Sequence, residues 1–493
     1  MGTSEGLAYS SPAGRWVIAV TVLGSGMAAI DATVVGIALP TIGRRFAAPI
    51  GTLQWVVTGY TLTMAALLLL GGSLGDRFGR RHVFSIGVVW FAVSSAACGV
   101  APSSTTLIVA RVVQGVGAAL LTPGSLAILQ ASFSQSDRGQ AIGAWSGLGG
   151  LASAAGPLLG GYLIAVASWR WIFFINVPVG AMVLAMSVRH VPESRDSSAS
   201  GQLDLLGAAI GMVSLAGITY GLIEGPAHGF GSPTVLAVLG VGLLGALGFV
   251  LIERASAAPM LPLGLFANQQ FSVTNVVTLI VYAALGGALF LLPVELQVVN
   301  HYSAFEAGAA LIPLTVVMLL LSARSGQLSA RIGPRLQMSL GPVVIGAGLA
   351  LLITSTTARS YVADVLPAML VFALGLSITV APLTTTALSA APTEQAGIAS
   401  AVNNCLARVG SLLAVAVLPA LAGISGEGYV QAGLLATGFR KAMVISASMC
   451  ALGGIVAAVG IKNPEGLATT PGAPAPQPHS HCALDAPPLG DER

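Results

Sequence analysis

Charge is the scarcest property of this sequence. Only 8% of its 493 residues are Asp, Glu, Lys or Arg, whereas 55% are hydrophobic. Soluble proteins carry about 25% charged residues. This chain therefore cannot cover a water-exposed surface with charge, and we expect a lipid bilayer to cover it. The net charge of +3 is also too small to favour nucleic acid as a partner.

The sequence also lacks the motifs that indicate catalysis, metal binding or ATP use. No Gly-x-x-x-x-Gly-Lys-Ser/Thr phosphate-binding motif occurs. No adjacent acidic pair precedes Asp491-Glu492, which argues against a membrane lipid transferase. Cysteine spacing suggests neither a disulfide framework nor a zinc site; the four cysteines are Cys98, Cys405, Cys450 and Cys482. We expect a protein that is not an enzyme and needs no metal or cofactor.

Apolar runs long enough to cross a bilayer are abundant. A spanning helix needs about 20 apolar residues. Fourteen such runs occur, at 16–39, 54–73, 83–101, 106–128, 140–165, 171–188, 204–223, 233–252, 272–293, 306–323, 338–354, 365–386, 398–421 and 441–460. The sequence therefore predicts an all-α integral membrane protein with fourteen transmembrane helices.

The distribution of Lys and Arg predicts how the chain is oriented. An even number of helices puts both ends on one side, and cytoplasmic segments are richer in Lys and Arg. With both termini in the cytoplasm, thirteen of these residues lie inside and six outside, while Arg111 and Arg408 remain within the bilayer. We expect a multi-pass protein of the cytoplasmic membrane with cytoplasmic termini.

A ten-residue segment occurs twice. Gly72–Arg81 and Gly326–Arg335 share five residues at an offset of 254, and each follows an apolar run. Both copies follow an even-numbered predicted helix, the second and the tenth, so they lie on the same side. Parallel repeats of this kind are typical of transporters whose two halves rock about a central site.

The repeat divides the chain into segments. Eight predicted helices separate the copies where two six-helix halves would give six, so the seventh and eighth are expected to be an insertion. The predicted segments are a cytoplasmic tail (1–15), a six-helix bundle (16–188), a linker (189–201), two inserted helices (202–253), a second bundle (254–461) and a disordered tail (462–493).

Four segments give the chain a resemblance to a known family. Gly72-Ser-Leu-Gly-Asp-Arg-Phe-Gly-Arg-Arg81 resembles the loop signature of the major facilitator superfamily, and Arg111–Ala119 resembles its arginine motif. Asp31–Pro40 and Gly156-Pro-Leu-Leu-Gly-Gly161 resemble signatures of its fourteen-helix drug:proton antiporter branch. The resemblance implies the major facilitator fold, alternating access and export driven by the proton gradient.

Asp31 and Arg111 are the strongest functional candidates. Asp31 precedes Pro40, the expected outer end of the first helix, by about 13 Å, and Arg111 follows the expected start of the fourth near Ser104 by about 10 Å. The two therefore lie at similar depth. Charges inside a membrane usually mark a transport pathway. We expect this pair to take up and release the coupled proton; a static structural ion pair is the alternative.

Two further motifs are expected to act on the conformational change. The first-loop residues Gly72, Asp76, Arg77, Gly79, Arg80 and Arg81 form a gating loop, or alternatively only a positive-inside anchor. The small residues and proline of the antiporter motif permit close helix contact, and the resemblance implies a seal against proton leak; they are Gly156, Pro157, Gly160 and Gly161.

The substrate cavity is expected to draw on polar and aromatic residues of both halves. The candidates are Glu295, Asn403, Asn404, Arg408, Trp55 and Tyr60. Glu295 either faces the cavity or is solvated at the interface, and Arg408 contacts substrate or hydrogen-bonds neighbouring helices. Trp55 and Tyr60 are candidate aromatic walls for a planar cation, the alternative being packing at lipid or the interface.

Together these observations predict proton-coupled efflux of amphipathic or cationic small molecules, with the protein acting as a monomer. A dedicated exporter of one metabolite, antibiotic or siderophore is the alternative. A channel is disfavoured, because no short filter-like segment occurs and the two-fold repeat favours rocking halves.

Overall fold

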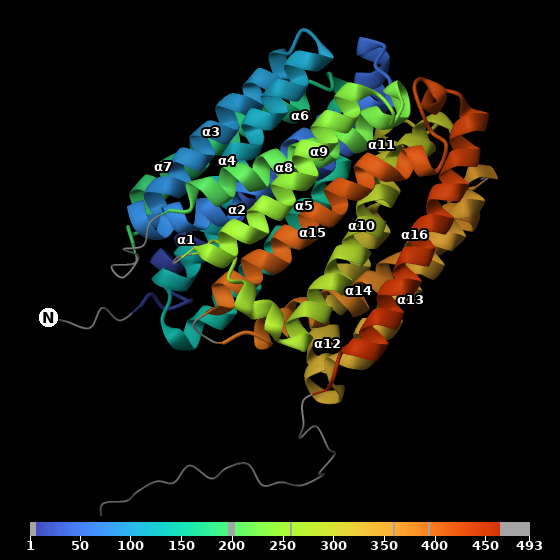
Figure 1. Ribbon diagram of the computed structural model, residues 1–493. Coiled ribbons are helices and arrows are strands. Elements are labelled where there is room, and N and C mark those ends of the chain that lie inside the picture. Colours follow the sequence, from blue (N-terminus) through green and yellow to red (C-terminus); the bar gives the residue numbers. More distant parts are fainter. Residues whose placement is uncertain (1–5, 196–202, 257–258, 358–359, 393–394, 464–493) are drawn as a thin grey trace, which may run out of the picture.

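The fold consists of long helices that run roughly side by side through the whole molecule (Figure 1). The computed structural model describes residues 6–195, 203–256, 259–357, 360–392 and 395–463. Within these ranges the chain is helical apart from turns, loops and one isolated β-bridge between Leu7 and Phe133. Fourteen segments are long and apolar enough to cross a membrane. The all-α fold with fourteen candidate spans is thus confirmed.

The first half of the chain supplies seven helices that make six candidate spans, because the helix is interrupted at Ile175, which divides the sixth span into α6 and α7. The helices are α1 (Pro12–Phe46), α2 (Ile50–Phe78), α3 (Arg80–Val100), α4 (Ser104–Ser132), α5 (Gln135–Val166), α6 (Trp171–Phe174) and α7 (Asn176–His190).

The second half also makes six candidate spans, and three of them consist of two helical elements each: α11 with α12, α13 with η2, and η3 with α14. The elements are η1 (Leu263–Ala267), α10 (Gln269–Val298), α11 (Ala304–Ala309), α12 (Ile312–Ile332), α13 (Pro334–Leu351), η2 (Leu352–Thr357), η3 (Tyr361–Val365), α14 (Leu366–Ser389), α15 (Ala396–Leu421), η5 (Gly428–Val430) and α16 (Ala432–Gly460).

Most helices extend beyond the apolar runs that predict them. The run 16–39 corresponds to α1, which continues through Pro40 to Phe46 and ends with Arg44 and Arg45 in its last turn. Pro40 was therefore the wrong end for this helix. Asp31 lies fifteen residues before the true end, or about 22 Å along the axis. Apolar runs miss such ends because polar residues continue the helix into the lipid headgroup region.

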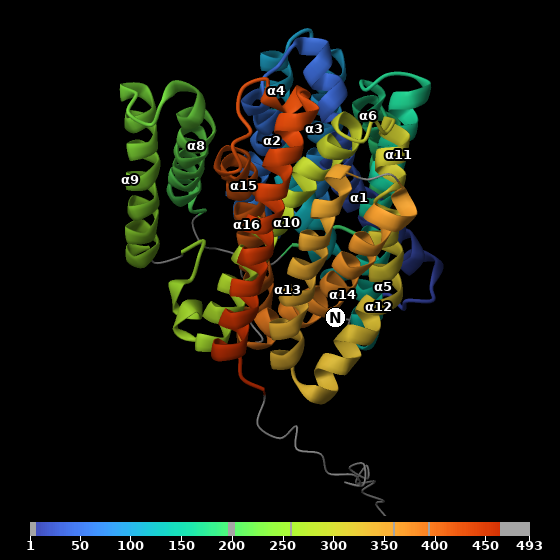
Figure 2. The same ribbon diagram turned by 90° about the vertical axis from the view of Figure 1, so that its right-hand side faces the viewer.

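The inserted helices stand beside the bundle as a separate pair (Figure 2). They are α8 (Leu205–His228) and α9 (Pro233–Ala255), and Gly217 and Gly242 let them pack closely. Only α8 makes extensive contact with the bundle, through α2 and α15. Since α2 and α15 come from different halves, α8 lies over the seam between the halves.

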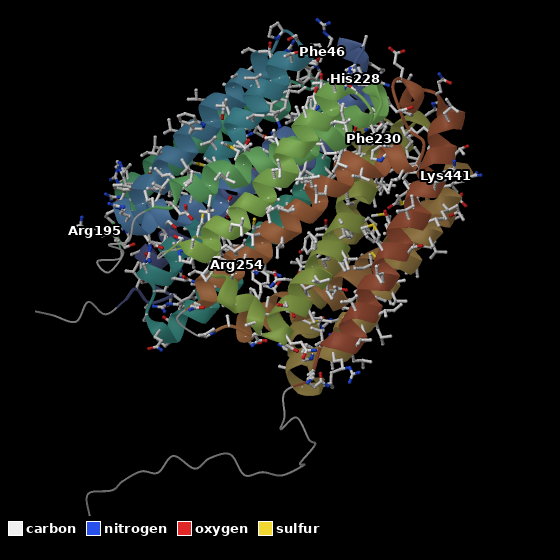
Figure 3. The ribbon with its side chains drawn as sticks, in the orientation of Figure 1. Phe46, Arg195, His228, Phe230, Arg254 and Lys441 are labelled. Carbon is white, nitrogen blue, oxygen red and sulfur yellow. The ribbon has the colours of Figure 1, made fainter. Side chains whose placement is uncertain are left out.

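The two ends of the bundle differ in the elements that they carry. We call the end with the start of α1 and the end of α16 the terminal face, and the other end the opposite face. Charged side chains gather at both ends, with Arg195 and Arg254 toward the terminal face and His228 and Lys441 toward the opposite face (Figure 3). Apolar side chains cover the length between them, as a bilayer requires.

The ten-residue repeat adopts the same geometry in both halves. Gly79 joins α2 to α3 with φ +109°, and Gly333 joins α12 to α13 with φ +84°. In each half, a side chain that follows the last helix accepts a hydrogen bond from a backbone N–H of the repeat. Glu193 accepts from Arg81 N (3.0 Å), and Asn463 Oδ1 accepts from Arg335 N (3.1 Å). The sequence repeat is thus also a structural one.

Hydrogen bonds and close contacts between the halves gather toward the opposite face. Gln54 on α2 donates to the carbonyl oxygens of Val415 (2.6 Å) and Ala416 (3.0 Å) on α15. Gln297 on α10 donates to Ile37 O on α1 (2.9 Å). Burial raises the pKa of Tyr429, so its hydroxyl remains a donor and bonds Ala48 O (2.9 Å). These contacts close the opposite face.

Helices α5 and α11 complete this closure by packing backbone against backbone. A Cβ atom on Gly161 would lie 2.5 Å from Ala304 O, and one on Gly308 would lie 2.2 Å from Pro157 O. On the same helix, Gly139, Gly143, Gly147, Gly149 and Gly150 have no neighbour within 4 Å of such a Cβ. The end of α5 nearer the terminal face is therefore open.

We expect Gly161→Ala to widen the opposite face, because the new methyl group must displace Ala304 and Phe305. Spin labels at Tyr162→Cys on α5 and Phe305→Cys on α11, in a background without the native cysteines, would measure the change. Gly150→Ala on the open part of α5 is the matched control. Equal distance distributions in the two variants would contradict the close-packed seal.

We expect Gly79→Ala to destabilise the protein by about 1–2 kcal/mol, because a Cβ atom disfavours positive φ and would lie 2.8 Å from Glu193 Oε1. Gly75→Ala is the control, since it lies within α2 and its Cβ would meet only Arg80 Cα at 3.9 Å. Thermal unfolding of the purified protein in detergent measures both, and an unchanged Tm for Gly79→Ala would refute the constraint.

Candidate functional site

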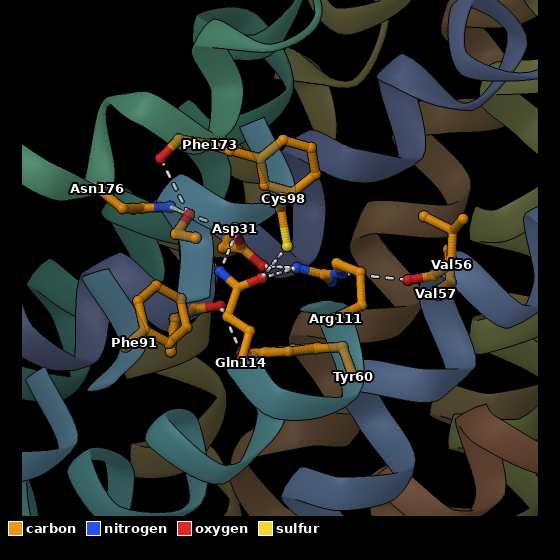
Figure 4. Close-up of polar contacts among 12 residues, drawn as sticks. Asp31, Val56, Val57, Tyr60, Phe91, Cys98, Arg111, Gln114, Phe173 and Asn176 are labelled. Atoms are coloured by element: carbon orange, nitrogen blue, oxygen red, sulfur yellow. Dashed lines mark hydrogen bonds and ion pairs between the residues drawn. The ribbon is translucent and has the colours of Figure 1, made fainter. Parts of the chain in front are cut away.

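A buried ion pair lies at the centre of the first half (Figure 4). Arg111 Nη1 on α4 donates to Asp31 Oδ2 on α1, and the two side chains are 1% and 0% exposed. The structure thus brings together the two residues that the sequence singled out. Burying two charges costs several kcal/mol each unless geometry and further hydrogen bonds compensate.

Amide side chains provide that compensation for the carboxylate. Gln114 Nε2 donates to Asp31 Oδ1 (2.9 Å), and Gln114 Oε1 accepts from Arg111 Nη1 (2.7 Å). Asn176 at the start of α7 donates to Asp31 Oδ1 (3.4 Å) and to Ser95 Oγ on α3 (2.9 Å). Asp31 therefore accepts hydrogen bonds from three side chains of two other helices.

The guanidinium group of Arg111 is held equally firmly. Its Nε donates to Val56 O on α2 (3.1 Å). Its Cζ lies 4.3 Å from the ring centroid of Tyr60 and 5.8 Å from that of Phe173, so aromatic rings contribute cation–π contacts. Tyr60 itself donates to Ala28 O (3.3 Å) and is 2% exposed.

We call Asp31, Arg111, Gln114, Asn176 and Tyr60 the polar cluster. Each of its side chains is at most 3% exposed, so no solvent reaches the carboxylate in this conformation. A proton could reach Asp31 only if neighbouring helices moved. The cluster joins α1, α2, α4 and α7, and any change in the charge of Asp31 would therefore act on the packing of the whole half.

Two members of this cluster, Gln114 and Asn176, are not among the residues predicted from the sequence. Gln114 lies within the arginine motif, three residues after Arg111, which places both on one helix face. Asn176 follows the tryptophan-rich turn before α7, where an isolated amide in an apolar segment was the available signal. Tyr60 was expected in the substrate cavity, but it is buried beneath Arg111 and presents no wall in this conformation.

The first-loop residues meet partners within their own half. Asp76 pairs with Arg80 one turn later (2.8 Å), and Arg81 pairs with Glu193 (3.5 Å). Arg81 Nη1 also donates to Val191 O (3.1 Å). Gly72 packs near Pro123 of α4, and Arg77 lies over the ring of Phe78. In this conformation these contacts tie the loop to the segment that follows α7.

Glu295 lies neither in an open cavity nor in solvent. Its side chain near the end of α10 is 0% exposed. Oε1 accepts from Asn300 Nδ2 (3.0 Å), whereas Oε2 is buried without a hydrogen-bond partner at normal geometry. The structure therefore shows neither of the two expected positions for Glu295. Its carboxyl group is enclosed by protein near the opposite face.

Trp55 points away from the centre, toward the inserted pair. Its Nε1 donates to Glu224 Oε1 on α8 (2.9 Å), and its ring lies 6.4 Å from that of Tyr220. Glu224 also pairs with His228 (3.3 Å). This placement does not favour the expected role of Trp55 in the cavity; the residue instead fastens α8 to α2.

The three candidates on α15 separate into two groups. Asn403 is buried and donates to Asn275 Oδ1 (3.0 Å) and Thr278 Oγ1 (2.8 Å), so it fastens α15 to α10. Asn404 is exposed and Arg408 is half-buried, and Arg408 Nε donates to Asn404 Oδ1 (3.1 Å). Only this second pair is accessible.

Among the described residues, no group of three or more His, Cys, Asp or Glu side chains could hold a metal ion. The polar cluster itself offers one carboxyl group, that of Asp31, which can gain or lose a proton when water reaches it.

Several curated proteins are similar in sequence. The multidrug resistance protein Stp of Mycobacterium tuberculosis is 36% identical over 81% of this chain and 74% of its own length. The methylenomycin A resistance protein of Bacillus subtilis is 34% identical over 86% and 91%. The tetracenomycin C resistance and export protein of Streptomyces glaucescens is 34% identical over 85% and 79%.

Solved structures of similar fold support the architecture. A bacterial homologue of the human lysosomal transporter Spinster, in an inward-facing and unoccupied conformation, superposes with a TM-score of 0.66 at 16% identity, covering 92% of this chain and 97% of that one. The sequence profile of the Major Facilitator Superfamily matches residues 21–415. This chain belongs to the major facilitator superfamily.

Proposed function

We propose that this protein is a proton-coupled exporter of small amphipathic molecules that works by alternating access across the cytoplasmic membrane. The observation that carries the proposal is the asymmetry of α5, which is packed against α11 at Gly161 and open around Gly150. One end of the bundle is closed and the other is open. A transporter that alternates between two such arrangements moves its substrate without ever forming a continuous pore.

The relatives support export as the direction. Stp is named for multidrug resistance, the Bacillus protein for methylenomycin A resistance, and the Streptomyces protein for tetracenomycin C resistance and export. Export of a toxic compound is one way to confer resistance to it, and the name of the Streptomyces protein states export directly. We therefore assign efflux of drug-like molecules to this chain, with a dedicated exporter of one compound as the second candidate.

The terminal face is the cytoplasmic one in this proposal. It carries the Arg-rich first loop and its repeat, and cytoplasmic loops are enriched in Lys and Arg. The described conformation is then open toward the cytoplasm, where it receives substrate. The inner face of α1 leaves space for it, because Ala32 is exposed and a Cβ on Gly36 would have no neighbour within 4 Å.

The polar cluster couples the proton to this cycle. Protonation of Asp31 removes the counter-ion of Arg111, which then needs a different acceptor, so that α1 and α4 separate or rotate. Deprotonation restores the pair and the arrangement described above. The membrane potential supplies about 2.3 kcal/mol for each charge moved across 100 mV, in addition to the pH gradient.

We expect the salt bridge between Arg81 and Glu193, at the terminal face, to break and re-form during the same cycle. Both side chains are about one-third exposed, so the pair is worth roughly 0–1 kcal/mol. Such a weak contact can exchange partners when the halves approach each other. We propose that the first loop then binds the second half and holds the cytoplasmic side closed.

We expect Asp31→Asn to abolish proton-driven uptake of substrate into inverted membrane vesicles. The same change leaves Arg111 buried without a counter-ion, which costs about 3–5 kcal/mol and can unfold the protein. The double variant Asp31→Asn/Arg111→Gln removes both charges and is the control for folding. It should unfold near the wild-type Tm and still lack proton-driven uptake, and full coupled uptake in either variant would refute the assignment.

The proposed function itself is tested with wild-type protein in inverted vesicles. We expect an imposed pH gradient to drive accumulation of several dissimilar dyes and drugs, and a protonophore to abolish it. Uptake that persists after the gradient collapses would contradict proton coupling. Accumulation of a single compound out of a broad panel would favour the dedicated exporter.

A further inference from the structure

Arg408 projects into the space between the two halves. Its own helix, α15, meets α10 through Asn403 and meets α2 through Cys405, whose Sγ lies 3.5 Å from Ala65 O. Successive residues of an α-helix are rotated by about 100° around its axis, so Asn404 and Arg408 lie on the helix face between these two contacts. Leu406 lies on the opposite face and packs against a cluster that includes Leu265 of η1. Helix α15 packs extensively against both α2 and α10. The guanidinium group is thus flanked by residues of both halves.

This guanidinium group has unused hydrogen-bonding capacity. In the described part of the chain, Nε donates to Asn404 Oδ1, and neither terminal nitrogen donates to any residue. None of the ion pairs formed by described residues includes Arg408. Arginine remains protonated in proteins and presents its N–H groups in a planar fork that fits a carboxylate or phosphate. The side chain is half-buried, so a small ligand can reach it.

The other charges of the interior do not balance this one. Asp31 is occupied by Arg111, and Glu295 is enclosed near the opposite face. Glu224 is bound to Trp55 and His228 outside the central space. A positive charge at membrane depth is costly unless it is paired or hydrated. Arg408 is therefore the one accessible, unbalanced charge of the interior among the described residues.

We propose that Arg408 is an anion-binding residue of the substrate site and that the transported compounds carry an acidic group. This inference rests on the proposed export function and narrows its substrate class. The terminal nitrogens of Arg408 bind the carboxylate, phenolate or phosphate of the compound, and Asn404 Nδ2 supplies a further donor. The half-buried Tyr282 lies beside the apolar part of the compound. A cationic compound, in contrast, meets an uncompensated positive charge.

A pair of dyes with one ring system and opposite charge tests this inference. Fluorescein is anionic at neutral pH, and rhodamine 123 is a cationic xanthene of similar size. Binding of each dye to the purified full-length protein in detergent is measured by fluorescence anisotropy, and transport is measured in inverted vesicles. We expect fluorescein to bind more tightly, and Arg408→Gln to weaken its binding about tenfold, the effect of losing about 1.4 kcal/mol. Rhodamine 123 should bind no more weakly to this variant than to the wild type, because the substitution removes the positive charge that a cation meets.

Two further variants separate charge recognition from folding. Arg408→Lys keeps the charge but loses the planar fork, and should retain part of the affinity for fluorescein. Arg254→Gln at the exposed end of α9 removes the same net charge far from the interior and should leave the binding of both dyes unchanged. Unchanged fluorescein binding in a folded Arg408→Gln variant would overturn the proposal, as would a wild-type protein that binds no acidic dye.

The outcomes distinguish this inference from the export function on which it rests. If wild-type vesicles accumulate rhodamine 123 but not fluorescein, export stands and anion recognition fails. If fluorescein binds in an Arg408-dependent way but no dye is transported, anion recognition stands and export fails.

Discussion

The pairing of Asp31 with Arg111 is the interaction on which the first half of the molecule depends. Neither charge can face lipid or remain alone, so α1 and α4 must present them to each other. Gln114, Asn176 and Tyr60 complete the arrangement from α4, α7 and α2. Because the Asp31 carboxylate accepts hydrogen bonds from α4 and α7, a change in its charge would act on the packing of all these helices.

The second half follows a similar helical plan but uses different chemistry. Its repeat turn at Gly333 has a positive φ, as does the turn at Gly79. In both turns, the backbone N–H two residues later donates to a side chain that follows the last helix of that half. In the part of it that the structure describes, however, the interior contains an amide network around Asn403 and one accessible arginine in place of a closed ion pair. One half thus encloses its charged pair, and the other presents an accessible charge. Under the proposed function, this division would separate proton exchange from substrate binding.

Much of the architecture could be predicted from the sequence, because the bilayer requires long apolar helices and the repeat reveals two related halves. Helix ends such as Phe46 were missed, since polar residues continue a helix beyond the apolar run. Asp31 and Arg111 were found because charges are rare in such a chain. The directions of Trp55, Tyr60 and Glu295 could not be found, because they depend on which neighbouring helix each side chain meets. Tertiary packing, which composition does not encode, decides that.

The inserted helices have a mechanical consequence. Helix α8 is hydrogen-bonded to α2 through Glu224 and Trp55 and also lies against α15, while α9 is attached through α8. If the halves rock as proposed, the pair stays with the half that holds this bond and slides over the other, and α9 moves through the surrounding lipid. Displacing annular lipids is then part of each transport cycle, so that membrane viscosity and lateral pressure would affect the turnover rate.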